Sequence, residues 1–568
     1  MRKERIRIFL EKRRGILITV LVVGLAFLGL FKLSWQSNID NMGGVHSWLS
    51  GSTIKFVNNW LDDGAINSNL TNYESPASIE FETMDDREPY LSYPSGQTFF
   101  VYMAARLTGK QQISISFLHK FQIVMFGIEA LLLATFVYYF SRRTLRQKSE
   151  LESVLIASLT AVLWMILPIC SYYLPNIYYA DQCVILWVMG LILVEYLFRT
   201  SSRKNGWLKL IRALTIYTGM LIDYFFWFLA FMFFVSEILE IWIENKKGKR
   251  KKAFLNTICW FGIPALLAVA TYYIQLSLTS NWFYIMIDRF NVRVVGEEMS
   301  MASMLKSIFG HFSQAFTLDG GLVFGLILMI LVTAIGGVVY LLVKKKMRRL
   351  ILNPGVSIVV FTTLAIISQI YFFKQHSAIH EFSILKVSWL IALLPLLMAA
   401  VCFWAFGVKN SQVLKIRKIK ISGFFVIFLV CYLLMFIVTG VPMSTNKYSQ
   451  ERLVKVDYSF ETMIRDKTNW DDVVFSYTEE IPTLPPQSLA ISKKRIYKID
   501  DINSIDEKIS NIKGQPKTVL LINKNIKLSG AQNEQQKCLE KEAQVRNEDE
   551  KYKLIEVADY SRCLSLGD

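Results

Sequence analysis

Long apolar runs recur along the first 440 residues and are separated by short polar or basic connections. Because a membrane-spanning helix needs about 20 mostly apolar residues, these windows predict about eleven transmembrane helices. The predicted spans are residues 16–33, 118–140, 152–169, 183–198, 208–222, 224–242, 254–276, 321–343, 352–373, 383–407 and 421–440. The pattern is that of an α-helical polytopic membrane protein.

Two polar segments are too long to be simple connections between spans. Residues 34–117 form a large, aromatic-rich first loop, and residues 441–568 form a tail without any spanning run. The tail alternates strand-like runs at 473–475, 495–499 and 519–522 with a helical stretch near 503–512. We therefore predict a transmembrane domain over 1–440 and a small α/β domain over 441–568.

Composition and charge support this interpretation. With 53% hydrophobic and 19% charged residues in 568, the chain is too apolar for a soluble protein. The net charge of +17 would suit a nucleic-acid-binding protein, but the Lys and Arg residues gather in the short connections, where they orient membrane helices. With the N-terminus in the cytoplasm, five basic connections fall on the same side: 142–148, 203–209, 246–252, 344–349 and 409–420. The predicted topology is N-in/C-out, and nucleic acid is not an expected partner.

The seven cysteines include no CxxC pair, so a structural zinc site is not expected. Cys538 and Cys563 are the two cysteines of the predicted outer tail, and Cys170 and Cys183 flank another outer connection. Either pair could form a disulfide on an oxidising side of the membrane. The sequence leaves both alternatives open.

Ionisable residues near the membrane mark candidate functional sites, because burying them in hydrocarbon is costly unless they face a cavity or water. Asp40 lies just beyond the first span, and His46 follows six residues later on a glycine-containing loop. A carboxylate in this position is a candidate general base or metal ligand. Asp62 and Asp63 precede Gly64, a pattern that favours a helix end over a catalytic role.

Further acids lie at the outer ends of later spans. Asp181 stands at the mouth of the fourth predicted span, and Asp223 forms the tip between two short spans. His376 and His380 are four residues apart, so on a helix they would share a face, with Glu381 adjacent. The order of residues is not that of a zinc helix, and hydrogen bonding to sugar or phosphate is the favoured role.

Cations that could bind a phosphate lie in the same outer connections. They are Arg289, Arg293, Lys374 and Lys386. Arginine suits bidentate recognition of phosphate, whereas lysine acts as a point charge. Acids, histidines and cations on one membrane face together predict a polar site covered by the first loop and the tail.

These features resemble those of the C-type (GT-C) membrane glycosyltransferases. The resemblance rests on Asp40 after the first span, on the first loop with Tyr93-Pro94-Ser95-Gly96, and on an outer α/β tail after about eleven spans. Segments around His46-Ser47-Trp48, residues 375–382, and residues 485–490 with 494–497 look like those of poorly characterised bacterial relatives in this group. The adjacent Asp-Glu pair that several members carry in the first loop is absent.

The resemblance implies transfer of a sugar from a polyprenyl-phosphate-linked donor to an extracytoplasmic glycan or lipid, at the outer face of a bacterial plasma membrane. Asp40 would take the proton of the acceptor hydroxyl, with His46 as the second catalytic residue. The remaining candidates would bind substrate or phosphate: Asp181, Asp223, Arg289, Arg293, His376, His380, Glu381 and Lys386. No metal site is assigned, although Mg²⁺ or Mn²⁺ bound by Asp40 and a second acid stays an alternative.

Three other functions are compatible with the sequence. A flippase or transporter for a lipid-linked glycan would carry charges through the middle of its spans, whereas here they concentrate at one face. A polysaccharide polymerase or ligase would favour a large loop between late spans. An assembly partner that lost activity is the third alternative, and it would tolerate Asp40→Asn without effect.

Overall fold

The computed structural model describes most of the chain. The described residues are 2–36, 39–75, 87–145, 147, 149–200, 205–244, 247–291, 300–316, 353–405, 412–416, 419–440, 455–510, 512, 516–558 and 563. The predicted span 321–343 lies outside them. Each of the other predicted spans overlaps one or more helical segments in its described part.

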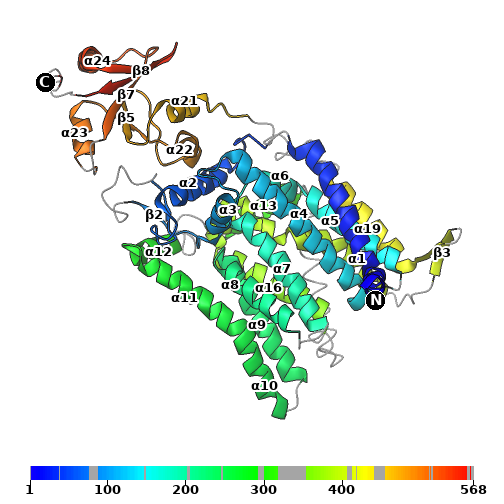
Figure 1. Ribbon diagram of the computed structural model, residues 1–568. Helices are drawn as coiled ribbons and strands as arrows, with labels where there is room; N and C mark the ends of the chain where they lie inside the picture. Colours follow the sequence, from blue (N-terminus) through cyan, green and yellow to red (C-terminus); the bar gives the residue numbers. More distant parts are fainter. Residues whose placement is uncertain are drawn as a thin grey trace.

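The transmembrane domain is a bundle of long apolar helices (Figure 1). Its main helices are α1 (Arg2–Leu30), α4 (Ile115–Tyr139), α5 (Glu150–Ile166), α7 (Ala180–Thr200), α8 (Gly206–Met220), α9 (Tyr224–Glu244), α10 (Lys247–Thr257), α11 (Ile263–Ser277), α16 (Pro354–Phe372), α18 (Ser388–Ala405) and α19 (Gly423–Gly440). Among the described residues, seven helices are long and apolar enough to cross a membrane, or eight if α5 and the bent α6 (Pro168–Asn176) form one span. The protein is thus a multi-pass membrane protein, and the count of eleven spans stays a prediction.

Basic segments lie at the end of the bundle away from the α/β domain. Figure 1 places the N-terminus, α10 and the strand β3 (Gln412–Ile416) at that end. β3 pairs with β4 (Ile419–Ser422) in an antiparallel hairpin. The placement fits the charge pattern from which the topology was predicted.

A buried ion-pair network holds α7, α8 and α9 together at their ends remote from the α/β domain. Arg212 of α8 is fully buried and pairs with Glu195 of α7 and Glu237 of α9. Arg199 pairs with Glu195 at 3.1 Å and with Glu240 at 3.9 Å. Because each buried charge has an opposite charge beside it, the network can exist within the apolar bundle.

The first loop folds into two helices and a short strand pair. α2 (Ser47–Asp63) and α3 (Gly96–Leu107) lie at the end of the bundle that faces the α/β domain (Figure 1). α2 ends at Asp63, followed by Gly64 with φ of 86°, and Asp63 accepts from Arg87 at 2.6 Å. The helix-end interpretation of this acidic pair is therefore confirmed. β1 (Asn72–Tyr73) and β2 (Pro89–Tyr90) complete the loop.

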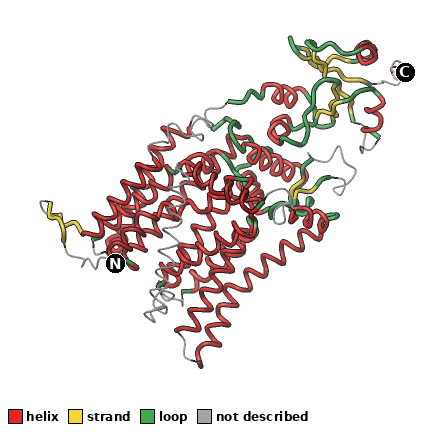
Figure 2. Tube along the Cα trace, turned by 180° about the vertical axis from the view of Figure 1, so that it is seen from behind, coloured by secondary structure: helices red, strands yellow, loops and turns green. Residues whose placement is uncertain are grey.

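The tail contains a five-stranded sheet in the order β6-β5-β7-β9-β8. Its strands are β5 (Asp472–Ser476), β6 (Ile496–Lys498), β7 (Lys517–Asn523), β8 (Gln544–Glu548) and β9 (Tyr552–Val557). β5, β6 and β7 are parallel, as their helical crossovers require, and β8 and β9 are antiparallel. The helices α21 (Ser459–Lys467), α22 (Pro486–Ser492), α23 (Asn503–Ile509) and α24 (Gly530–Glu542) accompany the sheet (Figure 2). The predicted strand runs and the helix near 503–512 are confirmed.

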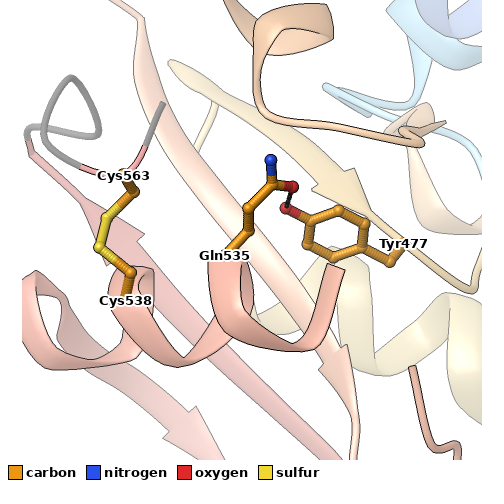
Figure 3. Close-up of a disulfide and its surroundings, with 4 residues drawn as sticks. All are labelled: Tyr477, Gln535, Cys538 and Cys563. Carbon is orange, nitrogen blue, oxygen red and sulfur yellow. Dashed lines mark hydrogen bonds between the residues drawn. A yellow bond between two sulfur atoms is a disulfide. The ribbon is translucent and has the colours of Figure 1, made fainter. Parts of the chain in front are cut away.

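A disulfide ties the end of the chain to α24 (Figure 3). Cys538 bonds to Cys563 across 25 residues. One turn earlier on α24, Gln535 accepts a hydrogen bond from Tyr477 at 3.2 Å. The other pair that the sequence left open does not form, since Cys170 and Cys183 are buried free thiols.

The α/β domain docks on the first loop through α22 and α2. Gly51 makes this close approach possible, because a Cβ built on it would lie 2.9 Å from the Cα of Gln487. Next to this contact, the Gln487 amide donates to Ser47 at 3.1 Å. α2 is mostly buried as a result, so its amphipathic pattern reflects packing against two partners, the bundle and the α/β domain.

Candidate functional site

The loop that carries His46 is held from two sides. On the bundle side, the Tyr172 hydroxyl of α6 donates to the carbonyl of Val45 at 2.8 Å. On the other side, the Tyr458 hydroxyl of the α/β domain donates to the carbonyl of Met42 at 3.0 Å. His46 itself adopts a left-handed backbone with φ of 62° at the start of α2. This conformation is rare for a residue with a side chain, and the contacts on both sides maintain it.

A tyrosine connects His46 to a buried carboxylate. Tyr173 Oη lies 2.8 Å from His46 Nδ1 and donates to Glu381 Oε1 at 2.9 Å. Because the single phenolic hydrogen goes to Glu381, the tyrosine oxygen must accept from His46, which places the imidazole hydrogen on Nδ1. The lone pair of the neutral imidazole is then on Nε2. This is the protonation state that a general base needs.

A second chain with the same chemistry lies beside the first. Tyr93 donates to Asp181 Oδ2 at 3.0 Å, and its oxygen lies 3.0 Å from His376 Nε2. Because the single hydrogen of the Tyr93 hydroxyl goes to Asp181, His376 must donate to the tyrosine oxygen, and its imidazole hydrogen is therefore on Nε2. The structure thus contains two carboxylate–tyrosine–histidine chains, one ending at His46 and one at His376.

Lys386 binds both acids that the sequence singled out at the outer ends of spans. Its Nζ lies 2.7 Å from Asp181 and 3.2 Å from Asp223, and all three side chains are at most 2% exposed. Asp223 also accepts from the backbone N–H of Phe225 at 2.6 Å. The cation of Lys386 is therefore committed to these two acids, which it holds in place.

His380 and Phe382 connect the two chains. The His380 ring lies 4.7 Å from that of His376 and 6.3 Å from that of His46, between centroids. Phe382 stacks on His380 at 4.9 Å and also contacts His46 and His376, at 5.1 and 6.1 Å. Three imidazoles thus converge around one phenyl ring, and the His46 side chain is 18% exposed, so the cluster is open to solvent at that residue.

Most of the residues predicted from the sequence lie in this cluster. The residues brought together are His46, Asp181, Asp223, His376, His380, Glu381 and Lys386. Asp40 lies on an exposed turn, and Arg289 is half-buried on α12 (Trp282–Phe290); no interaction between described residues joins either of them to the cluster. Arg293 lies outside the described residues.

The local geometry differs from prediction at His380. α17 (Lys374–Ile379) ends before it, and His380 has an extended backbone with φ of −113°, so the two histidines do not share a helix face. Their rings still meet because the chain turns directly into a 3₁₀ segment, Glu381–Val387. α13 (Met301–Phe316) supports α17 here, since His311 Nε2 donates to the carbonyl of Ala378 at 2.7 Å.

Two tyrosines of the site have roles that the sequence does not reveal. Tyr93 and Tyr173 occur in segments rich in other tyrosines, so nothing local distinguishes them. Only their partners identify them: each hydroxyl connects one histidine to one carboxylate.

No group of three or more His, Cys, Asp or Glu residues is arranged to hold a metal ion within the described ranges. Asp40, the acid considered as a metal ligand, is exposed. The imidazole, phenol and carboxylate side chains of the cluster offer acid–base and hydrogen-bonding chemistry.

Aromatic rings lead from the cluster to the surface of the bundle. Tyr224 stacks on Tyr93 with centroids 6.3 Å apart and contacts Phe373 at 6.1 Å. Phe373 contacts Phe372 at 5.2 Å, and Phe372 is 44% exposed on α16. The polar cluster is thus linked to an apolar face that can contact lipid.

Comparisons with known proteins give similarity in structure alone. No protein-family model and no curated protein matches the sequence. Among solved structures, the Archaeoglobus fulgidus oligosaccharyltransferase in the apo form matches with a TM-score of 0.45 and 12% identity, over 89% of this chain and 69% of that chain. ArnT from Cupriavidus metallidurans matches with a TM-score of 0.43 and 11% identity, over 97% of this chain and 98% of that chain.

A further match is the archaeal oligosaccharyltransferase AglB in complex with an inhibitory peptide and a dolichol-phosphate, with a TM-score of 0.48 and 11% identity. Oligosaccharyltransferase and ArnT are both GT-C glycosyltransferases, the superfamily that the sequence resembles. With TM-scores below 0.5, these structures assign no residue role and no substrate to this chain.

Proposed function

We propose that the protein transfers a sugar from a polyprenyl-phosphate-linked donor to a glycan or lipid acceptor outside the cytoplasm of a bacterial cell. The observation that carries the proposal is the pair of carboxylate–tyrosine–histidine chains, Glu381–Tyr173–His46 and Asp181–Tyr93–His376, which converge at one end of a membrane bundle. Transfer to a hydroxyl needs one group that takes a proton and another that stabilises the departing phosphate.

In the proposed reaction, His46 Nε2 takes the hydrogen of the acceptor hydroxyl. The acceptor oxygen attacks the anomeric carbon of the donor sugar, the bond from that carbon to the phosphate oxygen breaks, and the lipid phosphate leaves with the bonding electrons. The Tyr173–Glu381 pair stabilises the imidazolium that forms, as a carboxylate does for a catalytic histidine. His380 donates a hydrogen bond to the leaving phosphate, and His376 donates from Nδ1 when its imidazole is protonated, because its Nε2 hydrogen goes to Tyr93.

The aromatic face at Phe372 supports a lipid-linked donor. A prenyl chain is apolar, so it stays in the hydrocarbon of the membrane and avoids protein surface that is exposed to water. Within the hydrocarbon it can pack on aromatic rings. Its phosphate would then reach His376 past Tyr224 and Tyr93.

Asp40 stays a candidate base from the sequence, and the geometry favours His46 over it. Asp40 is exposed, whereas His46 has a tyrosine and a carboxylate aligned behind it. The two candidates predict different variants to lose activity, so the test includes both.

The test is transfer of labelled sugar, or release of polyprenyl phosphate, by detergent-purified protein from a panel of polyprenyl-phosphate sugars. We expect His46→Ala and Glu381→Gln to lower turnover by about 100-fold or more, the range of a general base. Glu150→Gln, at the start of α5, is the matched control and keeps wild-type turnover. A loss in Asp40→Asn with unchanged His46→Ala would make Asp40 the base.

Absence of turnover with every donor would overturn the proposal. If the wild type still binds a polyprenyl-phosphate sugar in that case, carriage of a lipid-linked glycan becomes the better hypothesis. A flux assay in proteoliposomes then measures it directly.

A further inference from the structure

A cavity of about 250 Å³ lies at the junction of the first loop and the α/β domain. Its walls come from the second half of α2, from α21 and the chain after it, and from the end of α22. It is therefore formed by two domains together. The other end of the α2–α22 contact borders an open cavity of about 540 Å³ that includes Val45 and Ser47, on either side of His46.

The walls of the smaller cavity carry more cations than acids. Lys55, Arg465, Lys493 and Lys494 line it together with Asp62, and two of these cations have acidic partners outside the lining: Lys55 pairs with Glu74, and Arg465 pairs with Asp466 at 2.8 Å. Lys494 donates to the backbone carbonyls of Trp470 and Asp472 at 2.7 and 2.8 Å, which hold its ammonium beside the cavity. Partial burial lowers the pKa of Lys493, against the opposing effect of Asp62.

Amide groups and an indole ring complete the lining. Asn469 contributes an amide, and Gln112 has a buried Oε1 without a hydrogen-bond partner. The amides of Asn58 and Asn59 also line the cavity, but they bond to backbone groups of the first loop. Trp470 is 53% exposed beside the cavity. Amides that bind hydroxyls and an aromatic face that stacks on a ring are the groups by which proteins bind sugars, and the volume suits a single sugar better than a lipid or a peptide.

We propose that this cavity binds an acidic sugar of the acceptor glycan, one that carries a carboxylate or a phosphate. The inference rests on the function proposed above. An anion there pairs with Lys493 and Lys494, and the indole of Trp470 packs on the sugar ring. The strand would continue along the α2–α22 contact toward Ser47 and the reacting centre at His46.

The first test measures binding to the full-length protein in detergent by calorimetry. The probes are an oligogalacturonate, an oligomer of glycerol phosphate, and a neutral malto-oligosaccharide of similar length. We expect at least one acidic probe to bind at least tenfold more tightly than the neutral one. Binding of the oligogalacturonate would identify the anion as a carboxylate, and binding of the glycerol phosphate oligomer would identify it as a phosphate. Equal binding of neutral and acidic probes, or none, would overturn the proposal.

Variants then locate the site. Arg465→Glu with Lys493→Glu lowers the affinity for the acidic probe at least tenfold, and both side chains are exposed enough to be changed without loss of folding. Lys527→Glu, an exposed lysine of the same domain outside the cavity, is the matched control. Trp470→Ala weakens binding of the oligosaccharide but not of inorganic phosphate. Unchanged affinity in the double variant would contradict the location.

The two proposals fail separately. His46→Ala binds the acidic probe as the wild type does while sugar transfer is lost, if both proposals hold. Binding without any transfer activity in the wild type would contradict the proposed reaction alone. Transfer without binding of any acidic probe would contradict the acidic-sugar site alone.

Discussion

His46 and Glu381 lie 3.9 Å apart, measured from Nδ1 to Oε1, and share the hydroxyl of Tyr173 between them. A carboxylate on the 3₁₀ segment thereby orients an imidazole on the first loop through a residue of α6. The same relationship joins Asp181 to His376 through Tyr93. The imidazole hydrogen lies on Nδ1 in His46 and on Nε2 in His376, so the lone pair is on Nε2 of the first ring and on Nδ1 of the second.

The hydroxyl of Tyr173 is the first element to test. Tyr173→Phe keeps the buried ring but removes the hydrogen bond to His46 and to Glu381. We expect kcat for sugar transfer to fall about 10- to 100-fold with little change in KM, because the variant disturbs orientation of the base and not substrate contacts. Tyr432→Phe on α19 is the matched control. Wild-type kcat in Tyr173→Phe would mean that His46 acts without this partner.

Lys386→Met removes the cation that binds two buried acids. Asp181 and Asp223 would be left without their charge partner, which costs about 3–5 kcal/mol of folding stability for a buried pair. Thermal unfolding in detergent measures the loss. Lys374→Met, a half-buried lysine of α17, is the control. Adding Asp181→Asn and Asp223→Asn should restore part of the stability, and an unaltered melting temperature in Lys386→Met would contradict the role of the ion pair.

Gly51→Ala tests how the α/β domain is attached. The added Cβ would lie 2.9 Å from backbone atoms of Gln487, so α22 must move away from α2. Limited proteolysis should then release the α/β domain faster than in the wild type. Transfer should also slow, because the Gln487–Ser47 and Tyr458–Met42 hydrogen bonds beside His46 are lost. Gly310→Ala is the control, because a Cβ at that position would meet only open space. Equal proteolysis rates in Gly51→Ala and in the wild type would show that the α2–α22 contact accommodates the added methyl group.

The acid in the wall of the cationic cavity, Asp62, predicts a pH dependence of anion binding. Partial burial raises the pKa of Asp62 to about 6, against the opposing effects of Gln112, Lys493 and Arg87 and with the help of Asp63. Below that pH the acid is neutral and no longer repels an anion. The affinity for an oligogalacturonate should therefore increase as the pH falls through about 6.

Asp62→Asn is the variant for this pH test, because it removes the titrating group and keeps its size. It should bind the acidic probe equally well on both sides of pH 6, and at neutral pH more tightly than the wild type. The same pH dependence in Asp62→Asn would assign the effect to another group. Isothermal titration at fixed ionic strength checks both variants.

Because of its disulfide, we expect the α/β domain to lose stability when reductant is added. Cys538 and Cys563 close a loop of 25 residues, and a link over such a length stabilises a domain by about 2–4 kcal/mol. Cys563→Ser should lower the unfolding midpoint of the α/β domain, and reductant should lower that of the wild type but not of the variant. Cys259→Ser, which changes an exposed free thiol, is the control. A variant that unfolds at the wild-type midpoint would show that the bond adds no stability.

The sequence by itself determined the class of protein and the outline of its parts. Apolar runs long enough to cross a bilayer have few alternatives to a helix, because lipid offers the backbone no hydrogen bonds. Short runs of apolar, β-branched and aromatic residues predicted the strands β5, β6 and β7, because residues of these types favour strands. Six acids and histidines of the cluster, together with Lys386, likewise stood out in the sequence, because ionisable residues are costly near the membrane.

Only the tertiary structure decided which of these residues meet. Tyr93 and Tyr173 have no local signature, and they became part of the site because helices distant in sequence place them between a histidine and a carboxylate. Lys386, expected to face a phosphate, instead binds Asp181 and Asp223, since a buried cation pairs with the nearest acids. The position of the α/β domain over His46 depends on Gly51, whose missing side chain matters only once another backbone packs against it. Contacts of this kind are set by packing in three dimensions, on which the periodicity of a single chain carries no information.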